Sequence, residues 1–307
     1  MQRTIRPPLG TTLLTYARHY DHNYTVAWSP DGKSIVSVNY YDGKIELWDA
    51  ATWQHLAFCP QLGMVNAAAW SPDGTYVALA QGSVHIWNPQ TNEIISANLD
   101  GGYDHWSRSL GWSPDMTRIA SSSHRNSIQI WDVQSGEGIY NYLGHTTTIT
   151  GVVWSPDGKY IASASIDGLV QVWDAAAGET LLSFRKHTKG ATAVAWSPDS
   201  AYVASACSSE VFVWEALTGT IITACQHEAH GQIAVAWSPD RKRIVSNAFS
   251  GVAIVWDAFS GEILCIYDEP TASGSDVVWS PDGKTIASTG LGIFLWDAWS
   301  GETRLIR

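Results

Sequence analysis

The tetrapeptide Trp-Ser-Pro-Asp occurs seven times in this chain at an almost constant spacing, and this repeat limits the possible folds more than any other feature. Its tryptophans are Trp28, Trp70, Trp112, Trp154, Trp196, Trp237 and Trp279. Successive copies are 42 residues apart, except for one interval of 41 residues. Such a period indicates equivalent supersecondary units that stack on one another, because one unit alone cannot bury its apolar side chains.

A second tryptophan follows each motif after 17 to 20 residues, and an acid or an amide comes directly after it. The seven pairs are Trp48-Asp49, Trp87-Asn88, Trp131-Asp132, Trp173-Asp174, Trp214-Glu215, Trp256-Asp257 and Trp296-Asp297. Two tryptophans per unit supply the large apolar groups that a packed core between neighbouring units needs.

Turn residues divide each unit into four short strands. In the fourth unit we expect strands over residues 149–154, 160–165, 169–173 and 180–185. Pro156 presets φ for a tight turn that Gly158 closes, and Asp167-Gly168 is a strong hairpin signal. Strands of this length joined by short turns predict an antiparallel meander.

These repeats resemble the WD40-repeat (WD-repeat) β-propeller family over nearly the whole chain, and the Trp-Ser-Pro-Asp-Gly turns look like those of bacterial tandem WD repeats. The resemblance implies one all-β domain over residues 1–307, a seven-bladed propeller with four antiparallel strands per blade. Residues 1–9 are then an N-terminal extension or the remnant of a linker. Such propellers often follow kinase or NTPase modules, so we expect a role within a larger assembly.

The resemblance also implies a hydrogen-bonded structural tetrad of His, Ser or Thr, Asp and Trp within a blade. The fourth unit matches it fully, with His145, Ser165, Asp167 and Trp173. The first unit has His19, Asp42 and Trp48, but Asn39 stands at the Ser position. In the other units the Asp is replaced by Gln81, Arg125, Ser208, Ser250 and Gly290. We therefore expect the tetrad to support only part of the ring.

Ring closure has two possible solutions in this sequence. Residues 10–19 resemble the outer-strand segment 178–187, yet residues 301–307 look like another outer strand. We favour closure by the N-terminal strand on the last blade, because that copy is longer and more apolar. In the alternative, the C-terminal hairpin keeps its local edge and residues 1–17 are free.

Catalytic signals are missing from the sequence, and we predict that the protein is not an enzyme and uses no cofactor. It contains no Walker loop, GxSxG, HExxH or helix-opening GxGxxG. The seven repeated aspartates are turn residues, since a catalytic carboxylate does not recur seven times in equivalent places. The segment His227-Glu228-Ala229-His230 is either a metal site or a solvated loop, and we favour the loop, predicting no metal.

Charge and cysteine content limit the partners and the compartment. A net charge of -11 argues against binding to nucleic acid or anionic membranes, which require a basic surface. The four cysteines lack the spacing of a metal site or a disulfide framework. The start of the chain lacks a signal-peptide pattern, and no run of about 18 apolar residues occurs. These observations predict a cytoplasmic protein.

Variable loop positions are the candidates for partner binding, because the shared residues are already used for packing. WD propellers commonly bind partners on the face formed by the loops before the first strand and between the second and third strands. In blades one to three these positions hold large aromatic, cationic and thioether side chains. The predicted partner-binding residues are His22, Tyr24, Tyr41, Met64, Trp106, Arg108 and His124.

Two functions fit these residues. A protein-interaction scaffold or sensor would use them to bind a protein or peptide, since such side chains are enriched at interfaces. Alternatively, the aromatic rings would stack on a small ligand or a glycan. Some rings also fit a purely structural role as plugs of the channel mouth. Trp53 and Trp299 lie toward the opposite face, where we expect them to cover a blade base rather than form a second interface.

Overall fold

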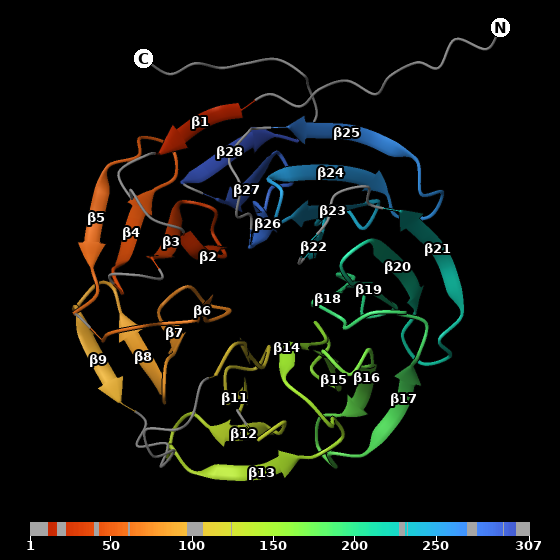
Figure 1. The fold of residues 1–307 in the computed structure, drawn as a ribbon. Helices are drawn as coiled ribbons and strands as arrows, with labels where there is room; N and C mark the ends of the chain where they lie inside the picture. Colours follow the sequence, from red (N-terminus) through yellow and green to blue (C-terminus); the bar gives the residue numbers. More distant parts are fainter. Residues whose placement is uncertain are drawn as a thin grey trace, which may run out of the picture.

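The protein folds into a ring of seven four-stranded antiparallel sheets arranged around a common centre (Figure 1). The computed structural model describes residues 12–16, 23–39, 43–60, 62–96, 107–123, 125–226, 231, 233–268, 275–290 and 292–298. Strands are the only regular elements in this part of the chain, and none of it forms a helix able to cross a membrane. The predicted all-β, seven-bladed propeller is confirmed.

The first four blades follow one another along the chain, each strand pairing with the next. Blade 1 contains β2 (Asn23–Trp28), β3 (Ser34–Asn39), β4 (Ile45–Asp49) and β5 (His55–Phe58). Blade 2 contains β6 (Ala67–Trp70), β7 (Val77–Ala80), β8 (Val84–Asn88) and β9 (Glu93–Ser96). Blade 3 contains β10 (Leu110–Trp112), β11 (Arg118–Ser122), β12 (Ile128–Asp132) and β13 (Gly138–Tyr142). Blade 4 contains β14 (Ile149–Trp154), β15 (Tyr160–Ser165), β16 (Val170–Asp174) and β17 (Thr180–Phe184).

The remaining blades complete the ring, and the last one combines both ends of the chain. Blade 5 contains β18 (Ala193–Trp196), β19 (Tyr202–Ala206), β20 (Glu210–Glu215) and β21 (Ile221–Gln226). Blade 6 contains β22 (Ile233–Trp237), β23 (Arg243–Ala248), β24 (Val252–Asp257) and β25 (Ile263–Asp268). Blade 7 contains β26 (Val277–Trp279), β27 (Thr285–Thr289), β28 (Ile293–Asp297) and β1 (Thr12–Tyr16).

The N-terminal strand closes the ring, as predicted. β1 pairs antiparallel with β28, with Thr12 opposite Trp296 and Tyr16 opposite Ile293. In Figure 1, β1 lies along the outer edge of blade 7 and leads into blade 1. The last blade is therefore built from both ends of the chain, which joins them without any covalent link. Residues 301–307, the other candidate for this edge, lie outside the described part of the chain.

The Ser-Pro-Asp turns are locked by their own side chains. In blade 1 the Ser29 hydroxyl donates to the Asp31 carboxylate at 2.7 Å, and the Gly32 amide donates to the Ser29 carbonyl at 2.9 Å. Gly32 has a φ of 70°, a left-handed conformation that glycine adopts without strain. The same serine-to-aspartate bond occurs in all seven blades at 2.5 to 2.7 Å. These aspartates are structural, in agreement with the sequence interpretation.

Aromatic rings form much of the packing between neighbouring blades. Trp173 of blade 4 is fully buried, and the Tyr142 ring of blade 3 stacks on it at 4.2 Å with an interplanar angle of 3°. One blade further on, Phe184 stacks on Trp214 at 4.6 Å. The outer strand of one blade thus covers the Trp-Asp tryptophan of the next. This contact buries large apolar areas that one sheet could not bury alone.

Candidate functional site

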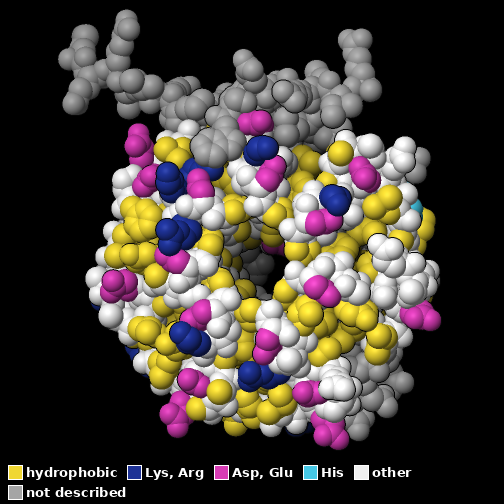
Figure 2. All heavy atoms as spheres, turned by 180° about the vertical axis from the view of Figure 1, so that it is seen from behind, with side chains coloured by type: hydrophobic (Ala, Val, Ile, Leu, Met, Phe, Trp, Pro, Cys, Tyr) yellow, Lys and Arg dark blue, Asp and Glu magenta, His cyan; other side chains and the backbone are white. Residues whose placement is uncertain are grey.

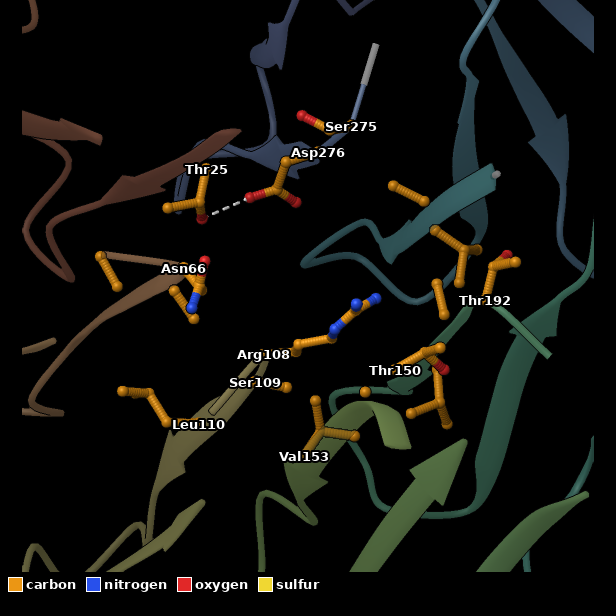
Figure 3. A pocket seen from close by; sticks show the side chains of 17 residues that line it. Thr25, Asn66, Arg108, Ser109, Leu110, Thr150, Val153, Thr192, Ser275 and Asp276 are labelled. Carbon is orange, nitrogen blue, oxygen red and sulfur yellow. Dashed lines mark hydrogen bonds between the residues drawn. The ribbon is translucent and has the colours of Figure 1, made fainter. Parts of the chain in front are cut away.

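The first strands of the blades surround a channel, and its lining is built from short side chains. The channel contains a pocket of about 240 Å³ (Figure 3). Residues lining it with polar side chains include Thr25, Asn66, Arg108, Ser109, Thr150, Thr192, Ser275 and Asp276. Most of them are short because seven strands converge on the narrow centre of the ring.

One sequence position supplies five of these lining residues. Asn66, Arg108, Thr150, Thr192 and Ser275 each lie four residues before the tryptophan of their Trp-Ser-Pro-Asp motif. This position includes Arg108, one of the predicted partner-binding residues. The structure places it at the channel, so its side chains surround one opening.

Arg108 differs from the other channel residues in size and charge. It is exposed, and its guanidinium extends toward the middle of the pocket in Figure 3. Within the described residues, no carboxylate lies within ion-pair distance of this guanidinium. Arg108 therefore presents five N–H donors that are available to an anionic or carbonyl group of a partner.

Asp276 lies across the pocket from Arg108 and joins blade 7 to blade 1. Its carboxylate accepts hydrogen bonds from the Thr25 hydroxyl at 2.8 Å and from the Val26 amide at 3.1 Å. Burial raises the pKa of Asp276, while the bonds from Thr25 and Val26 act in the opposite direction. The carboxylate is thus held by the seam of the ring and is not free for a ligand.

The structure describes the side chains of two of the seven predicted partner-binding residues. Met64 is 42% exposed in the loop before β6, and Arg108 is exposed at the channel. Tyr24 belongs to β2, but its side chain lies outside the described part. His22, Tyr41, Trp106 and His124 also fall outside it. Whether the seven side chains form one continuous patch stays a prediction.

Exposed apolar side chains also occur outside blades one to three. Ile166, in the loop between β15 and β16, is 50% exposed. Phe249, in the equivalent loop of blade 6, is 51% exposed. Both loops lie against glycines of neighbouring loops, where a Cβ on Gly190 or Gly231 would collide with Ile166 or Phe249. Close packing beneath these side chains directs them outward. Their exposure therefore could not be predicted from the residue type alone.

We use the name channel-mouth face for the end of the ring formed by the loops before each first strand and between second and third strands. Among the described residues, the large exposed hydrophobic side chains in its loops are Met64, Leu143, Ile166 and Phe249, and Arg108 lies at its centre. Antiparallel topology places these two sets of loops at the same end of every blade. The face therefore combines apolar side chains with a cation.

The opposite end of the ring, the turn face, carries the Ser-Pro-Asp turns. Its charges are largely paired: Asp199 accepts from Arg241 at 2.7 Å, and Asp31, Asp157 and Asp282 each lie 3.5 Å from a lysine. Seen from behind, the ring has acidic and basic side chains spaced around the central opening among apolar ones (Figure 2). Hydrogen bonds from the Lys33 amide and the Ser29 hydroxyl lower the pKa of Asp31. These carboxylates are ionised and already have partners.

The structural tetrad of blade 4 forms, but with a different serine. His145 Nδ1 lies 3.2 Å from Asp167, and His145 Nε2 lies 2.8 Å from the hydroxyl of Ser163. Trp173 Nε1 donates to the same hydroxyl at 3.3 Å. The sequence prediction assigned this role to Ser165, and the structure places Ser163 there instead. Burial lowers the pKa of His145, and the neighbouring Asp167 offsets only part of this effect.

Ser165 bonds elsewhere, because it lies two residues further along the strand. Its hydroxyl lies 3.1 Å from that of Thr147, in the loop before β14. Residues two apart share one face of a strand, so both serines looked equivalent in sequence. The correct position is recognisable from the repeat itself: Ser37, Ser121, Ser163, Ser205, Ser246 and Ser288 all accept the indole N–H of their blade.

Trp53 is half-buried and packs against the cluster shared by blades 1 and 7. This is the position that the sequence analysis expected for a residue covering a blade base. Trp299 lies outside the described residues.

Comparison with known proteins identifies the repeat. The family described as WD domain, G-beta repeat (WD40) matches residues 10–49, 55–88, 95–132, 136–174, 178–215 and 222–257. Guanine nucleotide-binding protein subunit beta-1 of Drosophila melanogaster is 32% identical over 143 residues, which are 44% of this chain and 41% of that protein. Guanine nucleotide-binding protein G(I)/G(S)/G(T) subunit beta-1 of Homarus americanus is 29% identical over 143 residues, with the same coverage. The chain covers about two fifths of the length of these curated relatives. Since the family matches cover most of the sequence, the chain belongs to the WD40-repeat family of β-propellers.

Proposed function

We propose that this propeller is a non-enzymatic protein-interaction scaffold or sensor whose partner, a protein or peptide, binds the channel-mouth face. The observation that carries the proposal is the exposure of Met64, Ile166 and Phe249 around a channel with Arg108, which has no ion pair within the described part of the chain. Large apolar residues and arginine are the types that contribute most to binding free energy at protein interfaces. The paired charges of the turn face offer less to a partner.

The relatives support a role in an assembly. Both printed names describe a subunit of a guanine nucleotide-binding protein, so those proteins work as parts of larger complexes. We extend this to the present chain as a proposal: it serves a multi-domain or multi-subunit assembly. The kind of partner follows from the charges of this chain. Arg108 at the channel favours an acidic group on the partner at that point. The net charge of -11 favours a neutral or basic surface on the rest of the partner.

More specifically, we propose that the partner contacts blades one to three through the predicted residues His22, Tyr24, Tyr41, Met64, Trp106, Arg108 and His124. The alternative is a small ligand or a glycan stacked on the same aromatic side chains. Both proposals use Arg108 and Met64, whose exposure the structure describes. They differ in the size of the surface that becomes buried on binding.

The remaining expectations are also proposals. We propose a cytoplasmic protein of the bacterial tandem-repeat type that binds neither nucleic acid nor membranes. Its four cysteines are free thiols, which suits a reducing compartment. Its acidic net charge opposes attraction to phosphate-rich surfaces.

Affinity capture from native lysate tests the proposal. Wild type is compared with two double variants. Trp106→Ala/Arg108→Ala changes the residues predicted in blades one to three, and Ile166→Ser/Phe249→Ser changes the exposed apolar residues of blades four and six. Leu217→Ser, which removes an exposed apolar side chain from the turn face, is the matched control. We expect a specific protein to be retained by wild type and Leu217→Ser and lost from at least one face variant with an unchanged melting temperature.

The result also separates the alternatives. Loss only in Trp106→Ala/Arg108→Ala supports blades one to three, and loss only in Ile166→Ser/Phe249→Ser moves the interface to blades four and six. Binding on a glycan array with no retained protein would favour the second function. Equal retention by both face variants, with loss in Leu217→Ser, would contradict the proposal.

A further inference from the structure

Blade 5 brings together a histidine, a cysteine and a glutamate that are distant in the sequence. His187 lies in the loop after β17, while Cys207 and Glu210 lie at the two ends of the turn between β19 and β20. Their ligand atoms all lie within 4.8 Å of one another, and Cys207 Sγ lies 3.8 Å from a Glu210 oxygen. His187 and Cys207 are buried, at 8% and 0% exposure.

The imidazole of His187 has one satisfied nitrogen and one unsatisfied nitrogen. Nε2 lies 2.8 Å from the Ser205 hydroxyl, which also accepts the indole N–H of Trp214 at 3.0 Å. Nδ1 is buried and has no hydrogen-bond partner among the described residues. With the proton on Nε2 and donated to Ser205, the lone pair of Nδ1 is free to bind a ligand.

Blade 4 shows what the usual partner of this nitrogen is. There His145 Nδ1 lies 3.2 Å from Asp167, in the turn between β15 and β16. The equivalent turn of blade 5 is one residue shorter: Ala164 pairs with Val170 in blade 4, whereas Ala206 pairs with Val211 in blade 5. No aspartate is present in the shorter turn. Cys207 and Glu210 stand beside the imidazole instead.

The three groups form a ligand set that suits zinc. Imidazole nitrogen, thiolate sulfur and carboxylate oxygen are its usual protein ligands, with bonds of about 2.0 to 2.3 Å. A tetrahedral centre with such bonds needs ligand atoms roughly 3.3 to 3.7 Å apart, so the observed separations require only small side-chain movements. Calcium and magnesium prefer all-oxygen sites and do not fit a cysteine.

Charge and the surrounding hydrogen bonds are consistent with this assignment. A thiolate and a carboxylate together balance the two charges of a zinc ion, so the bound site is neutral where it is buried. Ser205 orients the histidine, and Gln226 Nε2 donates to the second oxygen of Glu210 at 3.3 Å.

We propose that His187, Cys207 and Glu210 bind a zinc ion, which in blade 5 replaces the aspartate that holds the histidine ring in blade 4. Zinc binds His187 Nδ1, the Cys207 sulfur and a Glu210 oxygen, with a fourth position for a water molecule. The thiol of Cys207 loses its proton to solvent when the ion binds. The site stabilises the turn between β19 and β20, which belongs to the channel-mouth face.

Metal titration of the full chain tests the proposal. The protein is stripped with a chelator and dialysed against zinc, and bound metal is measured by mass spectrometry. We expect one zinc per chain and a higher melting temperature. Cobalt in place of zinc should give the charge-transfer absorption of a cobalt–thiolate bond, which identifies the cysteine as a ligand.

Variants assign the ligands. Because Glu210 is partly exposed, the Glu210→Gln variant should fold normally. It should nevertheless bind zinc at least tenfold more weakly than wild type. Cys207→Ser should bind at least tenfold more weakly and remove the cobalt–thiolate band. His145→Gln, the matched change in blade 4, should still bind one zinc per chain, because that blade has no cysteine beside its histidine.

Two results would overturn the proposal. One is a wild-type chain that binds no more zinc than Cys207→Ser. The other is zinc binding that survives Cys207→Ser and Glu210→Gln but is lost in His227→Gln/His230→Gln, which would assign the metal to the other histidine-containing segment. Neither result bears on partner binding, which the capture experiment tests separately.

Discussion

The carboxylate of Asp276 accepts a hydrogen bond from the hydroxyl of Thr25 at 2.8 Å, between residues 251 positions apart in the sequence. This bond crosses the seam where blade 7 meets blade 1. The antiparallel pairing of β1 with β28 borders the same seam. On the turn face, Pro281 of blade 7 lies so near Gly32 of blade 1 that a Cβ on Gly32 would be 3.6 Å from its ring. The ring is therefore closed at its channel, in its outer strands and on its turn face.

The first prediction concerns the pH dependence of this seam. Burial raises the folded-state pKa of Asp276 above its unfolded value of 3.8, so the ionised carboxylate costs stability above the folded pKa. That cost disappears as pH falls through the folded pKa toward 3.8. Relative to Asp276→Asn, wild type should therefore gain stability between pH 7 and pH 4, as measured by urea unfolding.

Asp282 is the matched control for that experiment. It lies in the turn of the same blade, where the Ser280 hydroxyl lowers its pKa below 3.8. Its stabilising contribution is present above 3.8 and is lost only at lower pH. The difference between wild type and Asp282→Asn should thus stay nearly constant from pH 7 to pH 5 and begin to shrink near pH 4, opposite to the change expected at Asp276. A constant difference for Asp276→Asn from pH 7 to pH 4 would contradict the account.

The second prediction concerns the tryptophan of the Trp-Asp pair. Trp173 is fully buried and stacks on Tyr142, so Trp173→Ala should lower the free energy of unfolding by about 3–5 kcal/mol. Trp53→Ala, at a half-buried position, should cost much less. Chemical denaturation measures both. Similar losses for the two variants would show that blade packing does not depend on this stack.

The third prediction separates the two serines of blade 4. Ser163→Ala removes the shared partner of His145 and Trp173, leaving two buried polar groups unsatisfied, so it should cost about 1–3 kcal/mol. Ser165→Ala removes bonds with the exposed Thr147 and a long bond, 3.3 Å, from the Asp167 amide, and should cost less. Unfolding free energies of the two variants decide this point, and the reverse order would restore Ser165 to the tetrad.

The fourth prediction uses truncation to test ring closure. Deleting residues 1–19 removes β1 and exposes the edge of β28, so the melting temperature should fall and unfolding should become less cooperative. Deleting residues 1–9 should change little, since that segment precedes the paired strand. If the deletion of residues 1–19 leaves the melting curve unchanged, the N-terminal strand does not close the ring.

Much of the fold was predictable because the sequence signals that specify a blade occur seven times. The spacing of Trp28 and its equivalents predicts the number of blades, and the turn residues of the fourth unit place its strands within one residue of those observed. The apolar pattern of residues 10–19 predicted the closing strand. A repeated signal averages out local ambiguity, which a single motif does not.

The site was less predictable, because it depends on contacts between unlike loops. Arg108 was identified from its position in the repeat, and the structure places it at the channel. Ile166 and Phe249 were passed over, since their exposure follows from packing against Gly190 and Gly231 in neighbouring loops. The cluster of His187, Cys207 and Glu210 has no recognisable spacing in the sequence, because its histidine comes from a different loop.

The central claim is that a protein partner contacts the channel-mouth face, and site-specific photo-crosslinking tests it most directly. A photoreactive phenylalanine analogue is placed at Phe249 on this face and, in a separate variant, at Leu217 on the turn face. In native extract we predict a discrete crosslinked protein from position 249, suppressed by Trp106→Ala/Arg108→Ala or Ile166→Ser, and none from position 217. A specific crosslink from position 217 alone would contradict the account.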